Sequence, residues 1–165
     1  MSNTITVDME NLTQEEREQL INLIEKSNKP KKRWRATKDK IYYFVDSDLT
    51  VASDTDNYVD IDDKHYKIGN YFKTEEEAEF EKEKCSVYQE LKDYAIEHNE
   101  GEIDWNNKKQ HKYYIYCYNG GIYIDNKNIT MYLGQIYFTS SEIANNAINT
   151  VGGDRIKKYL FGIDI

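Results

Sequence analysis

The side chains that could do chemistry in this chain gather in two short segments of opposite charge. Residues 46–63 contain seven aspartates and no basic residue. Residues 29–40 contain seven basic residues, one aspartate and Trp34. Clustered carboxylates suit a cation or a positively charged macromolecule, whereas clustered cations beside an aromatic ring suit nucleic acid. Each segment therefore has to be tested for the spacing of a specific site.

The acidic segment lacks the spacing of a calcium loop. An EF-hand requires the pattern D-x-[DN]-x-[DN]-G with glutamate at position twelve. Counted from Asp54, Tyr58 and Val59 stand at the third-ligand and glycine positions. We therefore expect a solvated acidic surface for binding a partner rather than a metal site. Its residues are Asp46, Asp48, Asp54, Asp56, Asp60, Asp62 and Asp63.

The basic segment has two interpretations that the sequence leaves open. It could neutralise phosphates while Trp34 stacks on or contacts a base. Alternatively, its lysines and arginines could pair with the aspartates of the same unit. The residues of the nucleic-acid interpretation are Lys31, Lys32, Arg33, Trp34, Arg35 and Lys38.

No other constellation specifies a reaction. The three histidines and two cysteines share no metal-ligand spacing, and the P-loop, GxSxG and GxGxxG motifs are absent from the sequence. Cys85 falls on the expected apolar face of a helix, where a thiol is inert, and Cys117 falls on a strand. We expect a protein that is not an enzyme and needs no metal or cofactor.

Composition narrows the class of protein further. The chain has 165 residues, a formal net charge of −8 and 13% aromatic residues, including 15 tyrosines. The aromatic content indicates an ordered protein, and the negative charge disfavours a nucleic-acid coat or a binder of anionic membranes. Isolated cysteines, with no apolar run near the length of a membrane span and no signal peptide, predict a location in the bacterial cytoplasm.

The elements that carry these segments follow an internal repeat. In each copy a tryptophan stands eight residues before a tyrosine-rich tract, and a glycine stands five residues before a threonine that opens a helix. These residues are Trp34, Tyr42, Gly69 and Thr74 in the first copy, and Trp105, Tyr113, Gly134 and Thr139 in the second. A fixed internal period indicates one supersecondary unit used twice.

The repeat predicts an α+β fold with an N-terminal helix followed by two related units, each a three-stranded antiparallel sheet packed on a helix. We expect residues 1–28 to hold the helix, 29–101 the first unit, and 102–165 the second unit with a short C-terminal helix. The third strands are predicted at residues 65–68 and 129–138, and the main helices at 75–98 and 140–150. Each unit alone is near the lower size limit for a core, so the two should pack together.

Two resemblances add to this interpretation. Trp34-Arg35-Ala36 followed by Ile68–Ala78 (IGNYFKTEEEA) is similar to AP2-type DNA-binding domains, which implies a three-stranded sheet that enters the major groove. The wider set of motifs resembles an uncharacterised family of phage and prophage proteins from low-GC Gram-positive bacteria. Those motifs are Ile68–Glu79, Ile103–Asn106, Lys112–Cys117, Ile136–Ala144 and Arg155–Gly162. This second resemblance implies a phage-encoded accessory protein and carries no activity.

A small, acidic, non-catalytic phage protein is expected to work by binding. The first hypothesis is an inhibitor of a host defence system, similar to anti-CRISPR proteins, whose partner is a host protein such as a Cas9-type nuclease effector. The alternative is a DNA-binding accessory or regulatory protein. A third is a sponge that holds a nucleotide signal between tyrosine-rich sheets. Self-association into a homodimer through those sheets is a further expectation.

Overall fold

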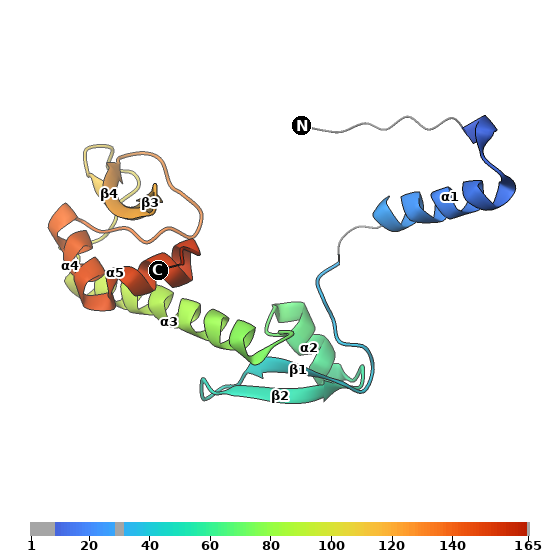
Figure 1. Ribbon diagram of the computed structural model, residues 1–165. Coiled ribbons are helices and arrows are strands. Elements are labelled where there is room, and N and C mark those ends of the chain that lie inside the picture. The colour runs from blue at the N-terminus through green and yellow to red at the C-terminus, as the bar shows by residue number, and fades with distance from the viewer. Residues whose placement is uncertain (1–8, 29–31, 165) are drawn as a thin grey trace. The chain divides into compact units, whose positions relative to one another are not determined.

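The computed structural model describes residues 9–28 and 32–164 (Figure 1). The chain divides into two compact units, and the boundary lies between Trp34 and Arg35. The first unit contains the short helix η1 (Met9–Asn11) and the helix α1 (Gln14–Asn28). The second unit contains both copies of the predicted repeat. The repeats therefore share one compact unit, as their small size led us to expect.

The helix α1 begins with a capping box. The Thr13 backbone N–H donates to Glu16 Oε2 at 2.8 Å, and the Glu16 N–H donates to Thr13 Oγ1 at 3.4 Å. This reciprocal pair satisfies two N–H groups that the first turn leaves without a helical partner. The apolar side chains of Ile21, Leu23 and Ile24 are exposed.

The first repeat is an antiparallel hairpin followed by two helices. Its elements are β1 (Lys40–Val45), β2 (Val51–Asp56), α2 (Asp60–Ile68) and α3 (Glu75–His98). Local hydrogen bonds close the hairpin turn: the Asp46 N–H donates to the Thr50 carbonyl at 2.8 Å, and Asp48 accepts from the Thr50 N–H at 3.1 Å. Short polar side chains that bond the local backbone in this way favour turns.

The predicted third strand at residues 65–68 is wrong, because these residues belong to α2. Asp60, Asp62 and Asp63 lie in the first turn of α2, where carboxylates interact favourably with the helix dipole. Gly69 then ends the helix at φ 88°, a conformation that glycine adopts without steric cost. The acidic residues that suggested a loop are thus part of a helix start.

Only one residue of a third strand remains in each repeat. Phe72 pairs with Tyr43 in an isolated antiparallel bridge, and Phe138 pairs with Tyr113 in the same way. Each bridge has two backbone hydrogen bonds of 2.8–3.0 Å. In the described chain each sheet is therefore two-stranded with a one-residue extension, and the expected three-stranded sheets are not formed.

The second repeat has the same order of a hairpin, a bridge and a helix. Its elements are β3 (Lys112–Tyr118), β4 (Gly121–Lys127), α4 (Ser141–Val151), α5 (Gly153–Arg155) and the π-helix η2 (Ile156–Leu160). Ser140, not the predicted Thr139, caps α4: its hydroxyl accepts from the Ile143 N–H at 3.1 Å. The Thr139 hydroxyl instead accepts from the Glu100 N–H at 3.0 Å.

The bridges fix how the two repeats correspond. Tyr43 is equivalent to Tyr113, and Thr74 to Ser140, because these residues hold the same places in the bridges and at the helix caps. The sequence pattern matched Tyr42 with Tyr113 and Thr74 with Thr139, so it was one residue out of register at both points. The structure thus gives the two copies a different alignment from the sequence pattern.

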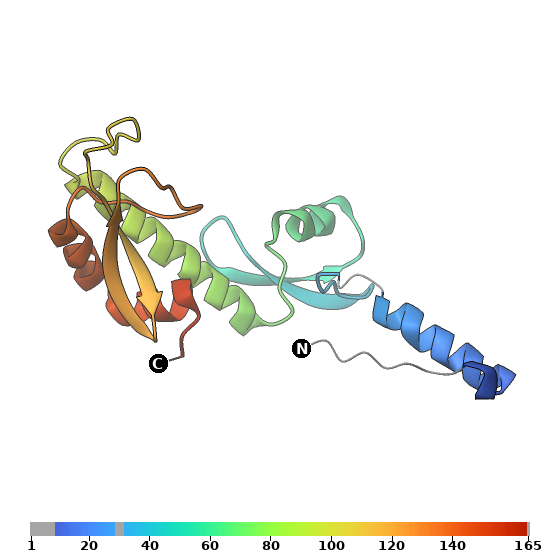
Figure 2. The same ribbon diagram turned by 90° about the horizontal axis from the view of Figure 1, so that it is seen from above.

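The helix α3 joins the repeats and has the predicted bounds. Thr74 caps it by accepting from the Glu77 N–H at 3.2 Å. It contacts β1 and β2 of the first repeat and α4 and η2 of the second, and both views show it as the long helix connecting them (Figure 2). The main hydrophobic core lies along it: Val87, Leu91, Ala95, Ile115, Phe138, Ala144, Ala147, Val151 and Ile156. A smaller core in the first repeat contains Ala36, Tyr42 and Tyr71.

Candidate binding surfaces

A buried ion pair joins the basic segment to the acidic segment. Arg35 Nε donates to Asp56 Oδ2 at 2.7 Å and Arg35 Nη2 donates to Asp56 Oδ1 at 3.2 Å. The Tyr71 hydroxyl and the Tyr58 N–H also donate to Asp56, at 2.7 and 2.8 Å. Asp56 is 0% exposed. Its hydrogen bonds, first of all the one from the Arg35 guanidinium, lower its pKa to about 2, so Asp56 is ionised at neutral pH.

Arg35 is fully engaged inside its own unit. Its Nη1 donates to Asp63 Oδ1 at 2.7 Å, and its guanidinium carbon lies 4.8 Å from the Tyr58 ring centre and 5.3 Å from that of Tyr66. Such a guanidinium holds together β2, α2 and the segment before β1. For Arg35 the pairing interpretation is therefore confirmed, and this side chain is not presented to nucleic acid.

Asp62 is also a structural residue. It is 1% exposed and accepts from the Asn57 and Val59 backbone N–H groups at 2.8 and 3.1 Å. The Tyr42 hydroxyl donates to it at 3.1 Å and lies 3.0 Å from His65 Nδ1. Burial, with the neighbouring Asp62 carboxylate, raises the pKa of Tyr42 well above its usual range.

The acidic surface predicted from the sequence therefore needs a correction. Asp56 and Asp62 are buried, and Asp63 is half-buried in its pair with Arg35. Charge density along a sequence does not reveal which carboxylates turn inward to satisfy a guanidinium or the N–H groups at a helix start. The residues that remain available, hereafter the exposed aspartates, are Asp46, Asp48, Asp54 and Asp60.

The exposed aspartates lie on the hairpin and at the start of α2. Asp46 and Asp48 belong to the hairpin turn and Asp54 to β2. Asp60 pairs with Lys64 at 3.0 Å, but both side chains are mostly in solvent, so water screens the pair. Within the described residues Asp46, Asp48 and Asp54 have no ion-pair partner. This part of the molecule therefore presents uncompensated negative charge.

The first turn of α3 adds carboxylates to the same repeat. Glu75, Glu76 and Glu77 are exposed there. Further along the helix, Glu79 and Glu81 form ion pairs with Lys82 and Lys84. Glu83, on the same helix, forms an ion pair with Arg155 at 3.5 Å. The negative surface of α3 is therefore concentrated at its N-terminal turn.

The basic segment is not carried on a strand. Residues 32–37 have no regular secondary structure, and β1 begins only at Lys40. The sheet that the AP2-type resemblance implied, with Trp34 and Arg35 on it, is therefore not formed. The side chains of the nucleic-acid interpretation that are exposed are Lys32, Arg33, Trp34 and Lys38, and Lys31 lies outside the described residues.

Across residues 9–28 and 32–164, histidine, cysteine and carboxylate side chains form no group of three that could hold an ion. Cys85, expected on a buried helix face, is exposed. The search for membrane spans in the same residues finds no helix with enough length and apolar character to cross a bilayer.

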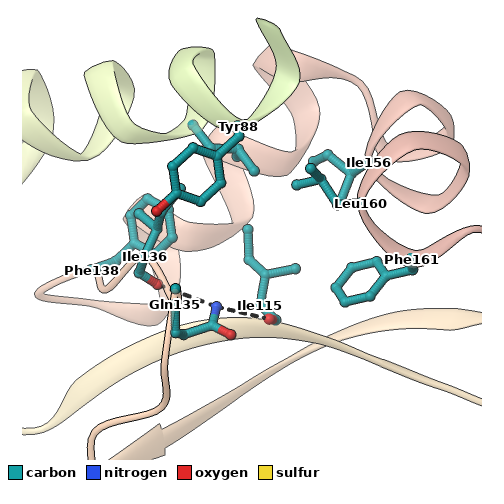
Figure 3. Close-up of a pocket in the computed structure, with 10 residues that line it drawn as sticks. Tyr88, Ile115, Gln135, Ile136, Phe138, Ile156, Leu160 and Phe161 are labelled. Atoms are coloured by element: carbon teal, nitrogen blue, oxygen red, sulfur yellow. Dashed lines mark hydrogen bonds between the residues drawn. The ribbon is translucent and has the colours of Figure 1, made fainter. Parts of the chain in front are cut away.

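A small cavity lies in the second repeat, between its sheet, α3 and the C-terminal helices (Figure 3). Its volume is about 210 Å³, and the Gln135 side-chain amide on its wall donates to the Ile115 carbonyl at 3.1 Å. None of its lining residues is charged: Tyr88, Leu91, Ile115, Gly134, Gln135, Ile136, Phe138, Ile156, Leu160 and Phe161. Small-molecule sites usually have about 300–1,000 Å³, so this space is a packing gap rather than a ligand site.

Comparison with known proteins gives no relative for this chain. No family model matches it, and no curated protein or solved structure resembles it significantly.

Proposed function

We propose that this protein is a non-catalytic inhibitor that binds a basic nucleic-acid-binding surface of a host defence protein, with a Cas9-type nuclease as the concrete target. The observation that carries the proposal is the set of exposed aspartates. Their segment, residues 46–63, contains no basic side chain. Arg35 lies outside this segment and pairs with the buried Asp56 and the half-buried Asp63, so it does not neutralise the exposed aspartates. Negative charge thus remains available on the outside of the first repeat.

The physical basis is competition for positive charge. A Cas9-type effector holds its heteroduplex in a positively charged channel that reads backbone geometry rather than sequence. Carboxylates on a folded hairpin can occupy such a channel in place of the phosphates of a nucleic acid, and the hairpin holds them in fixed positions. Complementary charge also accelerates the encounter of the two proteins. The glutamates in the first turn of α3 extend the same charge within the same repeat.

The resemblance to phage and prophage proteins supplies the setting for this proposal. A phage-encoded protein that acts in the bacterial cytoplasm meets defence effectors there. Binding is therefore the function that the surface supports best.

The test is a direct competition assay. A guide-loaded Cas9-type nuclease is mixed with fluorescent target duplex, and this protein is titrated in at low and at moderate salt. The proposal predicts displacement of the duplex, with an inhibition constant that rises steeply with salt because the contact is electrostatic. No displacement at either salt concentration, with several nuclease types, would exclude this target class.

DNA binding is the second candidate, and one observation favours it. Lys32, Arg33 and Lys38 are exposed in the basic segment, which also contains the half-exposed Trp34. A DNA-binding role predicts that Lys32→Ala with Lys38→Ala weakens duplex binding and lowers its salt dependence. If the protein alone binds no duplex at low salt, this candidate fails. The nucleotide sponge has no comparable support, because the cavity in Figure 3 offers no cation for a phosphate.

A further inference from the structure

The sheet of the first repeat is closed along most of its β1 edge. The Tyr43 N–H donates to the Phe72 carbonyl at 3.0 Å, and the Phe72 N–H donates back to the Tyr43 carbonyl at 2.8 Å. Further along β1, the Asn70 carboxamide accepts from the Val45 N–H at 2.8 Å and donates to the Val45 carbonyl at 2.7 Å. These hydrogen bonds use the outward groups in the middle and at the end of β1, so the edge that remains for an additional strand is β2.

The pairing of the hairpin determines which backbone groups of β2 point outward. Ser53 lies opposite Tyr43, whose N–H and carbonyl are directed to Phe72. In an antiparallel ladder such a pair is not hydrogen-bonded, so Ser53 directs its own N–H and carbonyl away from β1. The orientation alternates along a strand, and the backbone groups of Val51 therefore point outward as well.

The outward groups at the centre of β2 are open. At the end of β2 the Thr55 N–H donates to Asp54 Oδ1 at 2.7 Å, and the Thr55 carbonyl accepts from the Asn57 amide at 3.1 Å, so local side chains occupy that position. Among the described residues, the N–H and carbonyl groups of Val51 and Ser53 have no hydrogen-bond partner. A strand edge with unpaired backbone groups is a template for pairing with another chain.

Uncompensated negative charge lies beside this open edge. Asp54 is on β2 itself, and Asp46 and Asp48 belong to the adjoining turn; none of the three forms an ion pair within the described residues. A strand paired with β2 would place alternate side chains on the face that carries Ala52 and Asp54. Opposite charges in neighbouring strands attract and like charges repel, so lysine or arginine fits those positions and glutamate does not.

The free edge of the second hairpin lacks this charge. The bridge at Tyr113 turns alternate backbone groups of β4 outward by the same geometry. However, Asp125 of β4 forms an ion pair with Lys127 at 3.0 Å and also accepts from the Tyr114 hydroxyl at 3.0 Å. Charge complementarity for a basic strand therefore favours β2 over β4.

We propose that the open edge of β2 binds an extended basic segment of the target protein as an additional antiparallel strand. Its backbone would exchange hydrogen bonds with Val51 and Ser53, and its lysines or arginines would lie beside Asp54. In this mode of recognition the main-chain hydrogen bonds supply affinity and alternate side chains supply specificity. The inference deepens the proposed function and rests on it for the identity of the partner.

A second copy of β2 is a less suitable occupant. If two β2 strands paired antiparallel about Ser53, Asp54 of one copy would be a diagonal neighbour of Asp54 of the other on the same face. The two carboxylates would repel each other. The charge of the edge therefore selects a basic partner strand, and the test includes a second copy as a competing outcome.

The experiment uses the full chain and a synthetic probe at low salt. The probe is a short fluorescent peptide in which lysine alternates with threonine. One control peptide has the same composition with all its lysines in one block, and another has glutamine in place of lysine. We expect the alternating lysine peptide to bind at least about fivefold more tightly than either control, which corresponds to about 1 kcal/mol. Equal binding of the block peptide would overturn strand pairing and indicate charge attraction alone.

Backbone methylation of the probe tests the strand hydrogen bonds directly. When the lysines lie on the face of Asp54 in an antiparallel pairing, the threonine N–H groups point to β2 and the lysine N–H groups point away. N-methylation of the threonines should weaken binding at least about tenfold, whereas N-methylation of the lysines should change it by less than about twofold. Any other pattern would contradict the proposal.

Protein variants locate the binding site. Ser53→Pro removes an outward N–H without breaking a hydrogen bond of the hairpin, because proline is tolerated where an edge N–H faces solvent. It should weaken peptide binding at least about tenfold, whereas Thr130→Pro, at an exposed residue of the second repeat outside regular structure, should leave binding unchanged. Unchanged affinity in Ser53→Pro would refute the site, and the methylated peptides decide the proposal independently of how well this variant folds.

A charge variant tests the specificity of the edge. Asp54→Asn keeps an acceptor for the Thr55 N–H but removes the charge. It should lower the preference for the lysine peptide over the glutamine peptide at least about twofold, the size expected for an exposed ion pair. An unchanged preference would mean that Asp54 does not contact the lysines, and the proposed placement of the strand would be wrong.

A last measurement separates the alternative occupants. Sedimentation should give the same mass for the parent protein and Ser53→Pro. A dimer of the parent that Ser53→Pro converts to a monomer would mean that a second copy occupies the edge, and the proposal would be wrong. The peptide assay contains no nuclease, so its failure is distinct from failure of the proposed inhibitor function. Peptide binding without nuclease inhibition would retain the β2 site and reject the proposed target.

Discussion

Arg35 and Asp56 form a two-point ion pair, 2.7 and 3.2 Å long, in which a carboxylate of the acidic segment is fully buried against a guanidinium of the basic segment. The two segments that looked like separate binding sites in the sequence are therefore partly one internal network. Four exposed aspartates and a short exposed basic segment remain on the surface. The set of exposed charged residues is therefore smaller than the charge pattern of the sequence indicates.

Replacing Asp56 should destabilise the protein much more than replacing Asp54. Asp56→Asn leaves Arg35 without its buried partner, and we expect a loss of about 2–4 kcal/mol, somewhat discounted because the Arg35 side chain is 26% exposed. Asp54→Asn changes an exposed carboxylate and should stay within about 0.5 kcal/mol. Urea denaturation followed by circular dichroism measures both. Similar small losses would show that the ion pair contributes nothing.

Stability should also depend on pH through Asp56. Its folded pKa of about 2 lies below the unfolded value of about 3.9, so its contribution is fully present above the unfolded pKa. The contribution is lost as the pH falls toward the folded pKa and amounts to about 2 kcal/mol. Denaturation at about pH 6 and about pH 3 should show about half of this loss in the parent protein, because pH 3 lies between the folded and the unfolded pKa. The Asp56→Asn variant should lack the part of the acid-induced loss of stability that comes from Asp56. An identical dependence of stability on pH for both proteins would refute the lowered pKa of Asp56.

The amide side chains of Asn70 and Gln135, which hold the first strand of each hairpin, should contribute unequally to stability. Asn70 donates to and accepts from the Val45 backbone, whereas Gln135 donates to Ile115 alone on that strand. Each such hydrogen bond contributes about 1 kcal/mol. Asn70→Ala should therefore cost about 2 kcal/mol and Gln135→Ala about 1 kcal/mol in the free energy of unfolding. A larger loss of stability for Gln135→Ala than for Asn70→Ala would contradict this ranking.

Local signals in the sequence were sufficient for α1, α3, α4 and both hairpins, but not for α2. The Thr74 cap and the apolar spacing of Val87, Leu91 and Ala95 predicted α3 with its observed bounds. The third strands were wrong because residues 65–68 carry a strand-like composition, while the aspartates before them and Gly69 after them favour a helix. Tertiary context decided between these preferences, and periodicity over four residues is too short to do so.

The register of the repeat and the composition of the surface depended on contacts between distant residues. Trp34 and Trp105 suggested an alignment that the bridges at Tyr43 and Tyr113 correct by one residue. Likewise, the burial of Asp56 depends on Arg35 and Tyr71, which lie 21 and 15 residues away. Neither the register of the bridges nor the burial of Asp56 produces a recognisable pattern in neighbouring residues of the sequence. The one available signal was the basic segment close to the acidic segment, on which the pairing interpretation was based.

The central claim is that the exposed aspartates contact the target. The most direct measurement is the affinity of the protein for a guide-loaded Cas9-type nuclease, by isothermal titration calorimetry, for the parent and two charge-matched variants. One replaces Asp46, Asp48, Asp54 and Asp60 with asparagine, and the other replaces the exposed acids Glu97, Glu102, Glu142 and Asp164 with their amides. We predict at least about a tenfold loss for the first variant and less than about a twofold change for the second. Equal affinities for the two variants, or no binding by the parent protein, would contradict the claim.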